Sequence, residues 1–349
     1  MNILLLYGGR SSEHEVSISS ATNFLKGLKQ NQYDTYLVKI LQDNTWIYQD
    51  DQSKPLEHTN PKGIQVCLAP IGNKVWLIEI QSGKKIFEVN LVAPIMHGQT
   101  AEDGAIQGLC EFYDIAYIGP GILASATSFN KLVTKELVSK TYVNQAKYLA
   151  LTRLNQISEL DIVNDLGLPA FIKPASLGSS VGVSKVTDKA GLSQAIKTAL
   201  SYDNQVLIEE AIDGREVECA ILGNSDPIAS PTASIITKNF YDYQTKYHGS
   251  NPPNIELPSE IDPEIEARIK SQAIEIFRVL GCKGMSRVDF FLTKNNQIIF
   301  NEINTIPGFT QYSMYPKMIE LLGIDIGQLT KRLVELALTA KLQRQSLSL

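Results

Sequence analysis

Two runs of sequence near the C-terminal end decide the fold class: RVDFFL at residues 287–292 and IIFNEIN at residues 298–304. Polar and apolar residues alternate in these runs, which is typical of strands with one buried face. If Asn295-Asn296 between them forms a two-residue loop, Asp289 lies opposite Glu302. In the same register, Arg287 lies opposite Asn304. Side chains alternate between the faces of a strand, so the pattern predicts a β-hairpin with all four polar side chains on one face.

This predicted face carries ligands for a hard metal ion. The carboxylates of Asp289 and Glu302 and the amide oxygen of Asn304 are oxygen donors, which suit magnesium beside nucleotide phosphates better than zinc. Cross-strand ion pairs are also a common way to stabilise a hairpin. The hairpin alone therefore leaves two interpretations open, a metal site and an exposed hairpin with salt bridges.

A Gly-Ser segment, SLGSSVG at residues 176–182, connects predicted strands at 170–173 and 183–186. Glycines let the backbone approach an anion, the serine hydroxyls add donors, and Lys173 at the end of the first strand supplies a positive charge. The segment matches neither the GxxxxGK[ST] nor the GxGxxG nucleotide motif. The segment by itself leaves two interpretations open, an ordinary strand connection and a loop that covers phosphate.

The N-terminal third of the chain predicts a parallel α/β domain, because strands and helices alternate there. Its apolar strands are expected at residues 3–7, 35–40 and 91–96. Polar residues collect after these strands, where parallel sheets place their ligands: GGRSSEHEVS at residues 8–17, and His97. The alternatives are helix capping by Ser17, with the acidic residues near the positive helix end, and a purely structural role for His97.

A length of 349 residues predicts two or three domains. The glycines and proline at residues 119–121 favour a boundary there, after an N-terminal α/β domain of residues 1–120. A smaller α+β unit is expected over residues 121–210, and a third over residues 211–349. Within the third, the polar, proline-rich stretch from Tyr241 to Pro263 is longer than most connections, which is typical of lids, binding loops and disordered insertions.

Composition and charge exclude several classes of partner. A net charge of −5 and a pI near 5.5 provide no broad basic surface for nucleic acid. No stretch is long and apolar enough to cross a membrane, and the apolar run at residues 3–7 is too short for a signal peptide. The four cysteines are widely spaced, without a CxxC pair. We therefore expect a cytoplasmic protein with no nucleic-acid or membrane partner, no disulfide and no zinc site.

In their order and spacing, these segments resemble the motifs of the D-alanine:D-alanine ligases, a branch of the ATP-grasp superfamily. Agreement of many blocks in one order is a far more specific signal than any single block. The matching blocks, which run from Asn2 to about Ala337, are Gly8-Gly9-x-Ser11-x-Glu13-x-x-Val16-Ser17, His97-Gly98-x-x-x-Glu102-Asp103-Gly104-x-x-Gln107-Gly108, Gly178-Ser179-Ser180-Val181-Gly182, Phe240-Tyr241-Asp242-Tyr243-Gln244-Thr245-Lys246-Tyr247, Arg287-Val288-Asp289 and Asn301-Glu302-Ile303-Asn304-Thr305-x-Pro307-Gly308-Phe309-Thr310-x-x-Ser313-Met314-Tyr315-Pro316.

The resemblance implies a three-domain ATP-grasp fold with a Rossmann-like N-terminal domain. ATP would be gripped between the central and C-terminal sheets, and D-alanine would bind at the junction with the N-terminal domain. The implied reaction joins two D-alanines through a D-alanyl phosphate and releases ADP and phosphate, which supplies D-alanyl-D-alanine for peptidoglycan. The resemblance also implies two magnesium ions, with manganese able to replace them, and a homodimer formed through the N-terminal domain.

Each site residue is implied by its place in a matching motif. The metal ligands would be Asp289, Glu302 and Asn304. The ATP contacts would be Lys131, Lys173, Ser180, Glu209, Glu210, Glu216, Tyr241, Lys246 and Asn301, under a lid at about residues 238–258. D-Alanine would contact Val16, Ser17, His97 and Met314. The catalytic groups would be Glu13, Ser179, Tyr247, Arg287, Gly308 and Ser313.

Three positions depart from the family pattern. Asn130 stands where an aspartate usually precedes the phosphate-binding lysine, and Ala101 stands where glycine is common. Glu210 occupies a position where some relatives carry lysine, which puts the adenine contact there in doubt. Two other functions stay open: a ligase with D-lactate or D-serine as acceptor, and a nucleotide-binding regulator without turnover. In the family, a Lys-Tyr pair in the lid, here Lys246-Tyr247, accompanies D-alanine as the acceptor.

Overall fold

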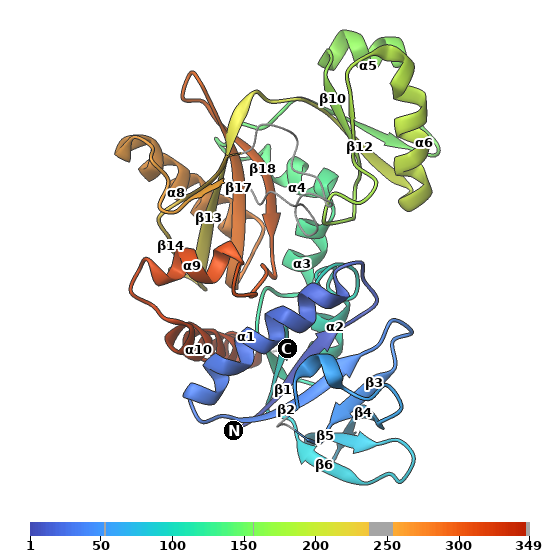
Figure 1. Cartoon of the computed structure of the whole chain (residues 1–349), viewed down its shortest axis with the longest axis vertical. Coiled ribbons are helices and arrows are strands. Elements are labelled where there is room, and N and C mark those ends of the chain that lie inside the picture. Colours follow the sequence, from blue (N-terminus) through green and yellow to red (C-terminus); the bar gives the residue numbers. More distant parts are fainter. Residues whose placement is uncertain (52–53, 156, 237–253, 347–349) are drawn as a thin grey trace.

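The structure is a computed structural model of residues 1–349, and it describes all of them except 52–53, 156, 237–253 and 347–349. The described strands form three sheets. The N-terminal sheet lies at one end of the molecule, the small central sheet lies at the other end, and the third sheet lies between them (Figure 1). The mixed α/β fold class predicted from the sequence is confirmed.

The N-terminal sheet has eight strands in the order β6-β5-β4-β3-β2-β1-β7-β8. β1 is parallel to β2 and β7, and β7 is parallel to β8, which confirms the predicted parallel core. Its helices are α1 (His14–Gln30) and α2 (Ala105–Phe112). The strands are β1 (Asn2–Gly8), β2 (Asp34–Ile40), β3 (Trp46–Gln49), β4 (Ile64–Ile71), β5 (Lys74–Glu79), β6 (Lys85–Glu88), β7 (Leu91–Pro94) and β8 (Ala116–Tyr117), and a short 3-10 helix lies at Leu56–His58.

The antiparallel half of this sheet, β3 to β6, was not predicted. β4 and β5 pair from Val66 opposite Glu79 to Ile71 opposite Lys74, which leaves Gly72-Asn73 as a two-residue turn. Gly72 has a φ of 66°, a conformation that favours glycine. The hairpin signal is therefore present in the sequence, but these strands expose many residues and lack the apolar runs by which the other strands were found.

The central sheet is antiparallel throughout, with the strand order β11-β10-β12-β9. Its strands are β9 (Tyr148–Thr152), β10 (Ala170–Pro174), β11 (Ser184–Val186) and β12 (Gln205–Glu210). The helices of this region are α3 (Ile122–Phe129), α4 (Lys131–Val138), α5 (Glu159–Leu166) and α6 (Leu192–Tyr202), with a 3-10 turn at Lys189–Gly191. The predicted boundary at residues 119–121 lies between β8 and α3.

The third sheet has the order β16-β15-β13-β17-β18, and β14 pairs with β13 outside this path. Its strands are β13 (Gly214–Gly223), β14 (Ile228–Ala229), β15 (Ala233–Ile236), β16 (Asn254–Glu256), β17 (Gly284–Thr293) and β18 (Ile298–Asn304). β16 falls inside the stretch from Tyr241 to Pro263 that was predicted to be a loop, so the prediction is wrong for these three residues. Residues 237–253 of that stretch lie outside the described residues.

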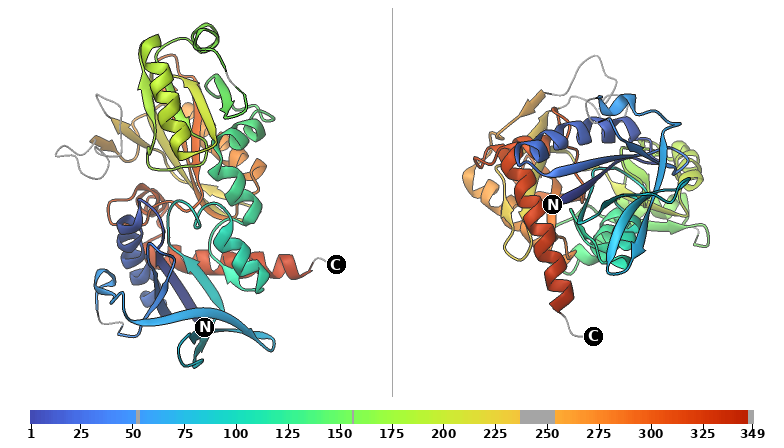
Figure 2. Two further views of the ribbon diagram at one scale, coloured as in Figure 1. Left: turned by 90° about the vertical axis from the view of Figure 1, so that its right-hand side faces the viewer. Right: turned by 90° about the horizontal axis from the view of Figure 1, so that it is seen from below.

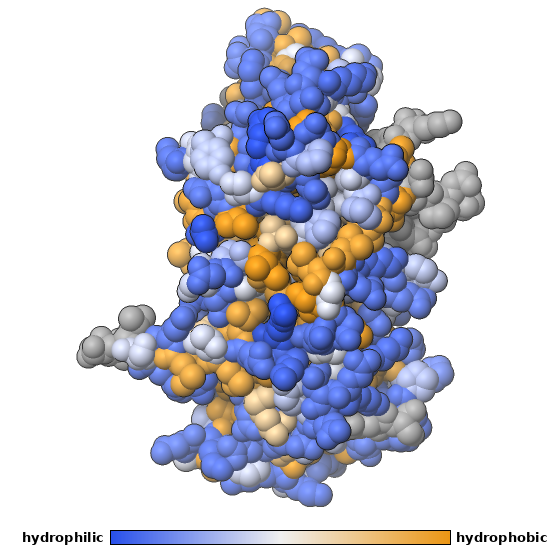
Figure 3. Space-filling model, turned by 90° about the vertical axis from the view of Figure 1, so that its left-hand side faces the viewer, coloured by the Kyte–Doolittle hydropathy of each residue, from blue (hydrophilic) through white to orange (hydrophobic). Residues whose placement is uncertain are grey.

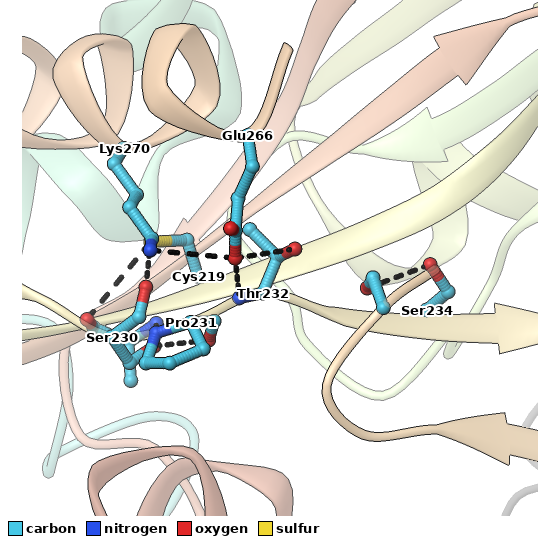
Figure 4. A network of polar contacts seen from close by, with 9 residues as sticks. Cys219, Ser230, Pro231, Thr232, Ser234, Glu266 and Lys270 are labelled. Atoms are coloured by element: carbon cyan, nitrogen blue, oxygen red, sulfur yellow. Dashed lines mark hydrogen bonds and ion pairs between the residues drawn. The ribbon is translucent and has the colours of Figure 1, made fainter. Parts of the chain in front are cut away.

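Helix α8 (Pro263–Val279) covers the third sheet and begins with strong local signals. The Asp262 side chain accepts the Glu264 amide, and proline fills the first helical turn. Figure 4 shows how the helix is joined to the segment just before β15: Glu266 accepts the Thr232 amide at 2.9 Å, and Lys270 lies 3.4 Å from the same carboxylate. The apolar face of the helix then packs on the sheet through Ile265, Ile269, Ala273, Ile276 and Phe277.

The β17–β18 hairpin keeps the predicted register at the site although its turn differs from the prediction. Asp289 lies opposite Glu302 and Arg287 opposite Asn304, as expected. The turn is one residue longer, because the Thr293 amide donates to the Gln297 carbonyl. A β-bulge compensates: Phe290 pairs with Phe300 while Asp289 pairs with Glu302, which leaves Asn301 as the extra residue.

Helices α9 (Met314–Glu320) and α10 (Ile326–Ser346) bring the C-terminal segment back to the N-terminal sheet (Figure 2). α10 lies against α1, where Asn31 Nδ2 donates to the Gly327 carbonyl at 2.8 Å. The ring of Phe309 meets Phe24 of α1 edge-on, with centroids 5.1 Å apart. One hydrophobic core thus joins the first and last parts of the chain. The division into three domains, at residues 1–120, 121–210 and 211–349, stays a prediction.

Three further observations concern the helices, the surface and the cysteines. Within the described part of the chain, we find no helix that is both long and apolar enough to span a bilayer. Hydrophilic residues dominate both ends of the molecule, while apolar residues gather across the middle of the face in Figure 3. All four cysteines are free thiols, of which Cys67 is exposed and the other three are buried.

Candidate active site

A cavity of about 810 Å³ lies where the N-terminal sheet, the Gly-Ser loop and the third sheet meet. Most of the residues predicted for catalysis or substrate binding line this cavity, although they lie far apart in the sequence. The predicted residues that do so are Glu13, Val16, His97, Lys131, Ser179, Arg287, Glu302, Asn304, Gly308, Ser313 and Met314.

The N-terminal turn and the Gly-Ser loop meet at Glu13. Its carboxylate approaches Gly178 so closely that a β-carbon there would lie 3.5 Å from Glu13 Oε2. The next two residues, Ser179 and Ser180, have φ angles of 53° and 57°, a left-handed conformation that costs energy for residues other than glycine. This loop therefore holds Ser179 at the cavity wall in a conformation that an unconstrained strand connection would avoid.

His97 joins two elements beside Glu13. Its Nε2 lies 3.2 Å from Ser20 Oγ, and its Nδ1 lies 3.1 Å from the Ile306 carbonyl. A carbonyl can only accept, so Nδ1 carries the proton and Nε2 accepts from the serine hydroxyl. Burial lowers the pKa of His97 although the charge of Glu13 opposes this effect, so the ring is neutral at pH 7. Ser20 Oγ also accepts the Phe309 amide at 3.1 Å, which ties α1 to the loop that carries Gly308.

Ser17 does not line the cavity. Its hydroxyl is buried, donates to the Ile95 carbonyl at 2.6 Å and accepts the Gly8 amide at 2.8 Å. The alternative role of Ser17 as the helix cap is wrong, because the N-cap position of α1 is Glu13. Ser17 instead fixes the turn between β1 and α1, and any contact with a substrate through its side chain is left as a prediction.

The basic side of the site begins at the N-terminus of α4. Asn130 caps this helix by accepting the Leu132 and Val133 amides, each at 3.1 Å. Its amide nitrogen also donates to Ser176 Oγ at 3.1 Å, so the departure from aspartate adds a link to the Gly-Ser loop. Lys131 follows and donates to the Leu177 carbonyl. Burial lowers its pKa, and a cation at the positive end of a helix is unfavourable, so this end favours an anion.

A buried charge triad lies behind Lys131. One carboxylate oxygen of Glu209, Oε1, lies 2.6 Å from Lys135 Nζ, and the other, Oε2, lies 2.6 Å from Lys173 Nζ. Burial would raise the pKa of Glu209, but the two ammonium groups lower it to about 2. Lys135 was missed in the sequence. The available signal was its position four residues after Lys131, which places both lysines on one face of α4.

The acidic side of the site is built on β13, β17 and β18. Arg287 donates twice to Asp289, with distances of 2.8 Å from Nε to Oδ1 and 2.6 Å from Nη2 to Oδ2. Asn304 Nδ2 donates to Asp289 Oδ2 at 3.1 Å. Burial raises the pKa of Asp289 to about 7 although Arg287 opposes the rise, and Glu218, 3.4 Å from Arg287, adds to it. A divalent cation would relieve this crowding of negative charge.

Ligand atoms for a metal ion gather on this side. One oxygen each from Glu216, Glu218 and Asp289 lies within 4.8 Å of the others, and Glu302 and Asn304 line the adjacent cavity. The donor set is oxygen, which suits magnesium or manganese, so the residues fit the implied cofactor. Glu218 was missed, although period two along β13 places it on the face of Glu216 and the sheet register places it opposite Asp289.

The loop after β18 brings Gly308 and Ser313 together. A β-carbon on Gly308 would lie 2.7 Å from Ser313 Oγ, so only glycine fits without movement. Ser313 occupies the N-cap position of α9, and its hydroxyl accepts the Thr310 amide at 3.0 Å. The next residue, Met314, opens the helix and lines the cavity. Gly308, Ser313 and Met314 thus lie together in the lining of the cavity.

The other predicted residues lie outside the cavity lining or outside the described residues. Glu210 accepts the Lys147 amide at 2.8 Å, which occupies one of its oxygens. The predicted residues that do not line the cavity are Ser17, Lys173, Ser180, Glu209, Glu210, Glu216, Asp289 and Asn301. Tyr241, Lys246, Tyr247 and the lid at about 238–258 fall wholly or mostly in the undescribed range 237–253.

A basic surface with a Gly-Ser loop faces a carboxylate cluster across one cavity, and these parts lie on the two sheets that follow an N-terminal α/β layer. This combination defines an ATP-dependent ligase of the ATP-grasp class. The solved structures agree: the D-alanine–D-alanine ligase of Coxiella burnetii superposes with a TM-score of 0.87 and 31% identity, over 99% of this chain and 96% of that one. The D-Ala:D-Ser ligase VanG of Enterococcus faecalis gives 0.86 and 34%, over 96% and 99%.

Sequence comparisons narrow the class. The family model for the D-ala D-ala ligase N-terminus matches residues 2–120, and the model for the D-ala D-ala ligase C-terminus matches residues 137–335. The D-alanine–D-alanine ligase of Proteus mirabilis is 40% identical over 97% of this chain and 95% of its own length. D-Alanine–D-alanine ligase A of Escherichia coli K12 is 39% identical over 97% and 96%. The chain belongs to the D-alanine–D-alanine ligase family.

Proposed function

We propose that this chain joins two D-alanines by using ATP to convert the carboxylate of the first into an acyl phosphate. As a member of the D-alanine–D-alanine ligase family, it is an ATP-dependent ligase of peptidoglycan synthesis. The observation that supports the route through an acyl phosphate is the facing pair of charged surfaces, because phosphoryl transfer to a carboxylate requires that the repulsion between two anions be offset.

The phosphates of ATP would bind on the basic side. Lys131 at the N-terminus of α4, Lys173 on β10 and the amides of the Gly-Ser loop provide cations and donors on one side of the cleft. Both carboxylate oxygens of Glu209 contact lysines, so its proposed contact with adenine would use the backbone. Ser180, Glu210, Glu216 and Asn301 complete the proposed nucleotide contacts.

The metal ions would bind on the acidic side, held by Asp289, Glu302 and Asn304. When bound, magnesium or manganese would neutralise phosphate charge and polarise the transferred group. Arg287 would exchange part of its pairing with Asp289 for the oxyanion that forms when the second D-alanine attacks the acyl carbonyl. The Gly308 amide would be the second donor to this oxyanion.

Glu13 would hold the ammonium of the first D-alanine, with Val16, Ser17 and His97 shaping its subsite. The neutral state of His97 fits this place, because a second cation beside the ammonium would be repelled. Ser313 and the Met314 amide would bind the carboxylate of the second D-alanine. Ser179 would form a hydrogen-bonded network with Glu13 and Tyr247, and the lid would exclude water from the acyl phosphate.

The acceptor is the part of the proposal that has a specific rival. The similarity to a D-Ala:D-Ser ligase at 34% identity keeps D-serine as a second candidate acceptor. We favour D-alanine because the Proteus mirabilis and Escherichia coli relatives described above, at 40% and 39% identity, are D-alanine–D-alanine ligases and because Lys246-Tyr247 fits that acceptor. If Tyr247→Phe left the rate with D-alanine unchanged, the proposed network would lose its basis.

One experiment tests the reaction and the acceptor together. The purified protein is mixed with ATP, magnesium and D-alanine, and phosphate and dipeptide are both quantified, with L-alanine, D-serine and D-lactate in parallel. We expect equal amounts of phosphate and D-alanyl-D-alanine, and no product from L-alanine. A mixed product with D-serine or D-lactate would reassign the acceptor, and ATP binding without turnover would favour a regulator.

Two further parts of the proposal concern the setting of the enzyme. Because the reaction consumes ATP, we place it in the cytoplasm. We also propose a homodimer formed through the N-terminal domain. Sedimentation at working concentration should give twice the mass of 38.6 kDa, and a monomer there would exclude the dimer.

A further inference from the structure

We infer that Lys135 is a positioning residue for nucleotide binding. It occupies one oxygen of Glu209, so that Glu209 and the two lysines together keep a surplus positive charge for phosphate. The inference rests on the proposed phosphate role of Lys173. None of the family motifs quoted above includes Lys135, and it does not line the cavity.

The geometry places Lys135 behind the site. Its side chain is 2% exposed, and its Nζ lies 2.6 Å from Glu209 Oε1 and 5.4 Å from the ring centre of Tyr148. The other oxygen, Glu209 Oε2, lies 2.6 Å from Lys173 Nζ. Glu209 thus pairs with both lysines at once, one through each carboxylate oxygen.

Charge counting explains why two lysines share one glutamate. The formal charges of Lys135, Lys173 and Glu209 sum to +1, and the ion pairs favour the charged forms of two of them: the pKa of Glu209 is lowered to about 2 and that of Lys173 is raised. Without Lys135, Glu209 and Lys173 form a pair with no net charge, and both carboxylate oxygens can turn to Lys173. The attraction for phosphate would then fall although Lys173 itself is intact.

Lys135 also fixes distances between the phosphate-binding elements. It lies on α4, whose first residue is Lys131, while Glu209 and Lys173 lie on the adjacent strands β12 and β10. The Lys135–Glu209 ion pair therefore joins α4 to β12, and the Glu209–Lys173 ion pair continues the link to β10, which carries the other proposed phosphate lysine. Replacing Lys135 would loosen this link as well as change the charge.

A purely structural role for the triad makes a different prediction. A buried ion pair contributes little net stability, because desolvation of the charges offsets their attraction, whereas removal of one partner destabilises the fold. A general loosening of the fold would weaken the binding of all ligands of the cleft by the same factor. A loss of phosphate attraction would weaken ligands in proportion to their phosphate charge, so the two roles separate in a comparison of nucleotides with the nucleoside.

The test measures binding of ATP, ADP and adenosine by calorimetry to the wild type, Lys135→Met, Lys135→Arg and the exposed control Lys140→Met. We expect Lys135→Met to weaken the binding of ATP and ADP by about tenfold or more. The binding of adenosine should weaken by less than about twofold, since the loss of a charge affects mainly anions. Lys135→Arg and Lys140→Met should stay near the wild type. Equal weakening of adenosine, or unchanged binding of ATP, would overturn the inference.

The double variant Lys135→Met/Glu209→Gln provides an independent check, and it covers the case in which Lys135→Met folds poorly. Removing both charges leaves Lys173 with its charge of +1, so the preference for ATP over adenosine should return. A double variant with no such preference would overturn the charge argument. If the wild type itself does not prefer ATP to adenosine, the proposed phosphate role of Lys173 fails first, and the inference falls with it.

Discussion

The two charged regions that face each other across the active site are built in opposite ways. On the basic side, two lysines share one glutamate, and the surplus charge is positive. On the acidic side, Glu218 and Asp289 contact one arginine, the carboxylate of Glu216 lies beside them, and the surplus charge is negative. In the proposed function, the basic side would bind phosphate directly, whereas the acidic side would need a cation before it could approach the same phosphates. This difference gives a physical reason for the metal requirement.

The largest effect is expected from removing a charge on the acidic side. Glu302→Gln keeps the shape of the side chain but removes one anionic ligand, so metal-dependent turnover should fall by about a thousandfold or more, in line with the loss of a group that stabilises transferred charge. Turnover as a function of magnesium concentration is the measurement, with the melting temperature as the check on folding. Full activity at ordinary magnesium would refute the metal assignment of Glu302.

Replacing the arginine of the acidic side should have two opposite consequences. Arg287→Met removes a donor to the oxyanion, so kcat should fall by about a hundredfold. It also removes the cation that pairs with Asp289, so the surplus negative charge grows and half-maximal activity should require less magnesium.

The matched control for this prediction is Arg287→Lys, which keeps the charge but loses the bidentate hydrogen bonds to Asp289. The lysine variant should lose kcat without gaining affinity for magnesium. If both variants shift the magnesium requirement equally, charge is not what links Arg287 to the metal.

A substitution in the loop after β18 should reduce activity less than the changes of charge above, because the loop acts by its position. Gly308→Ala places a β-carbon 2.7 Å from Ser313 Oγ, so the loop must move and kcat should fall by about tenfold. Gly108→Ala, whose β-carbon would meet nothing closer than 4.0 Å, is the control and should keep full activity. Steady-state kinetics with D-alanine is the measurement, and unchanged kcat in Gly308→Ala would show that the loop adapts freely.

The acidic and basic sides also differ in how far the sequence could predict them. The register of the β17–β18 hairpin follows from alternation and the local turn, so Asp289, Glu302 and Asn304 could be placed on one face from the sequence. The turn itself was wrong by one residue, and the bulge at Asn301 corrected the register. Local patterns thus predicted the β17–β18 part of the acidic side, because these two strands are adjacent in sequence.

The basic side depends on contacts between distant segments. Lys135 and Glu209 are brought together by the packing of α4 on the central sheet, which no local period encodes. Glu218 was missed for a related reason, since its neighbour Asp289 lies on a strand seventy residues away. The return of α10 to the N-terminal sheet and the four antiparallel strands of that sheet also arise from tertiary packing rather than from apolar runs.

The smallest predicted effect concerns Glu102, another acidic residue that lines the cavity. Its carboxylate accepts the Gly98 amide at 2.9 Å. Burial, with the charge of Glu13, raises its pKa from 4.5 to about 8. The folded state therefore holds this proton more tightly than the unfolded state does. Its contribution to stability is fully present below pH 4.5 and is lost as the pH rises to about 8.

Glu102→Gln has no proton to lose, so its stability without ligands should exceed that of the wild type increasingly between pH 5 and pH 9. We expect a difference on the order of 1 kcal/mol at the upper end, since water in the cavity moderates the full shift. Denaturant unfolding at pH 5, 7 and 9 measures it, with the exposed Glu320→Gln as the control. A difference that stays constant with pH would mean that Glu102 is ionised in the folded protein, and that the acidic side carries still more negative charge for the metal to neutralise.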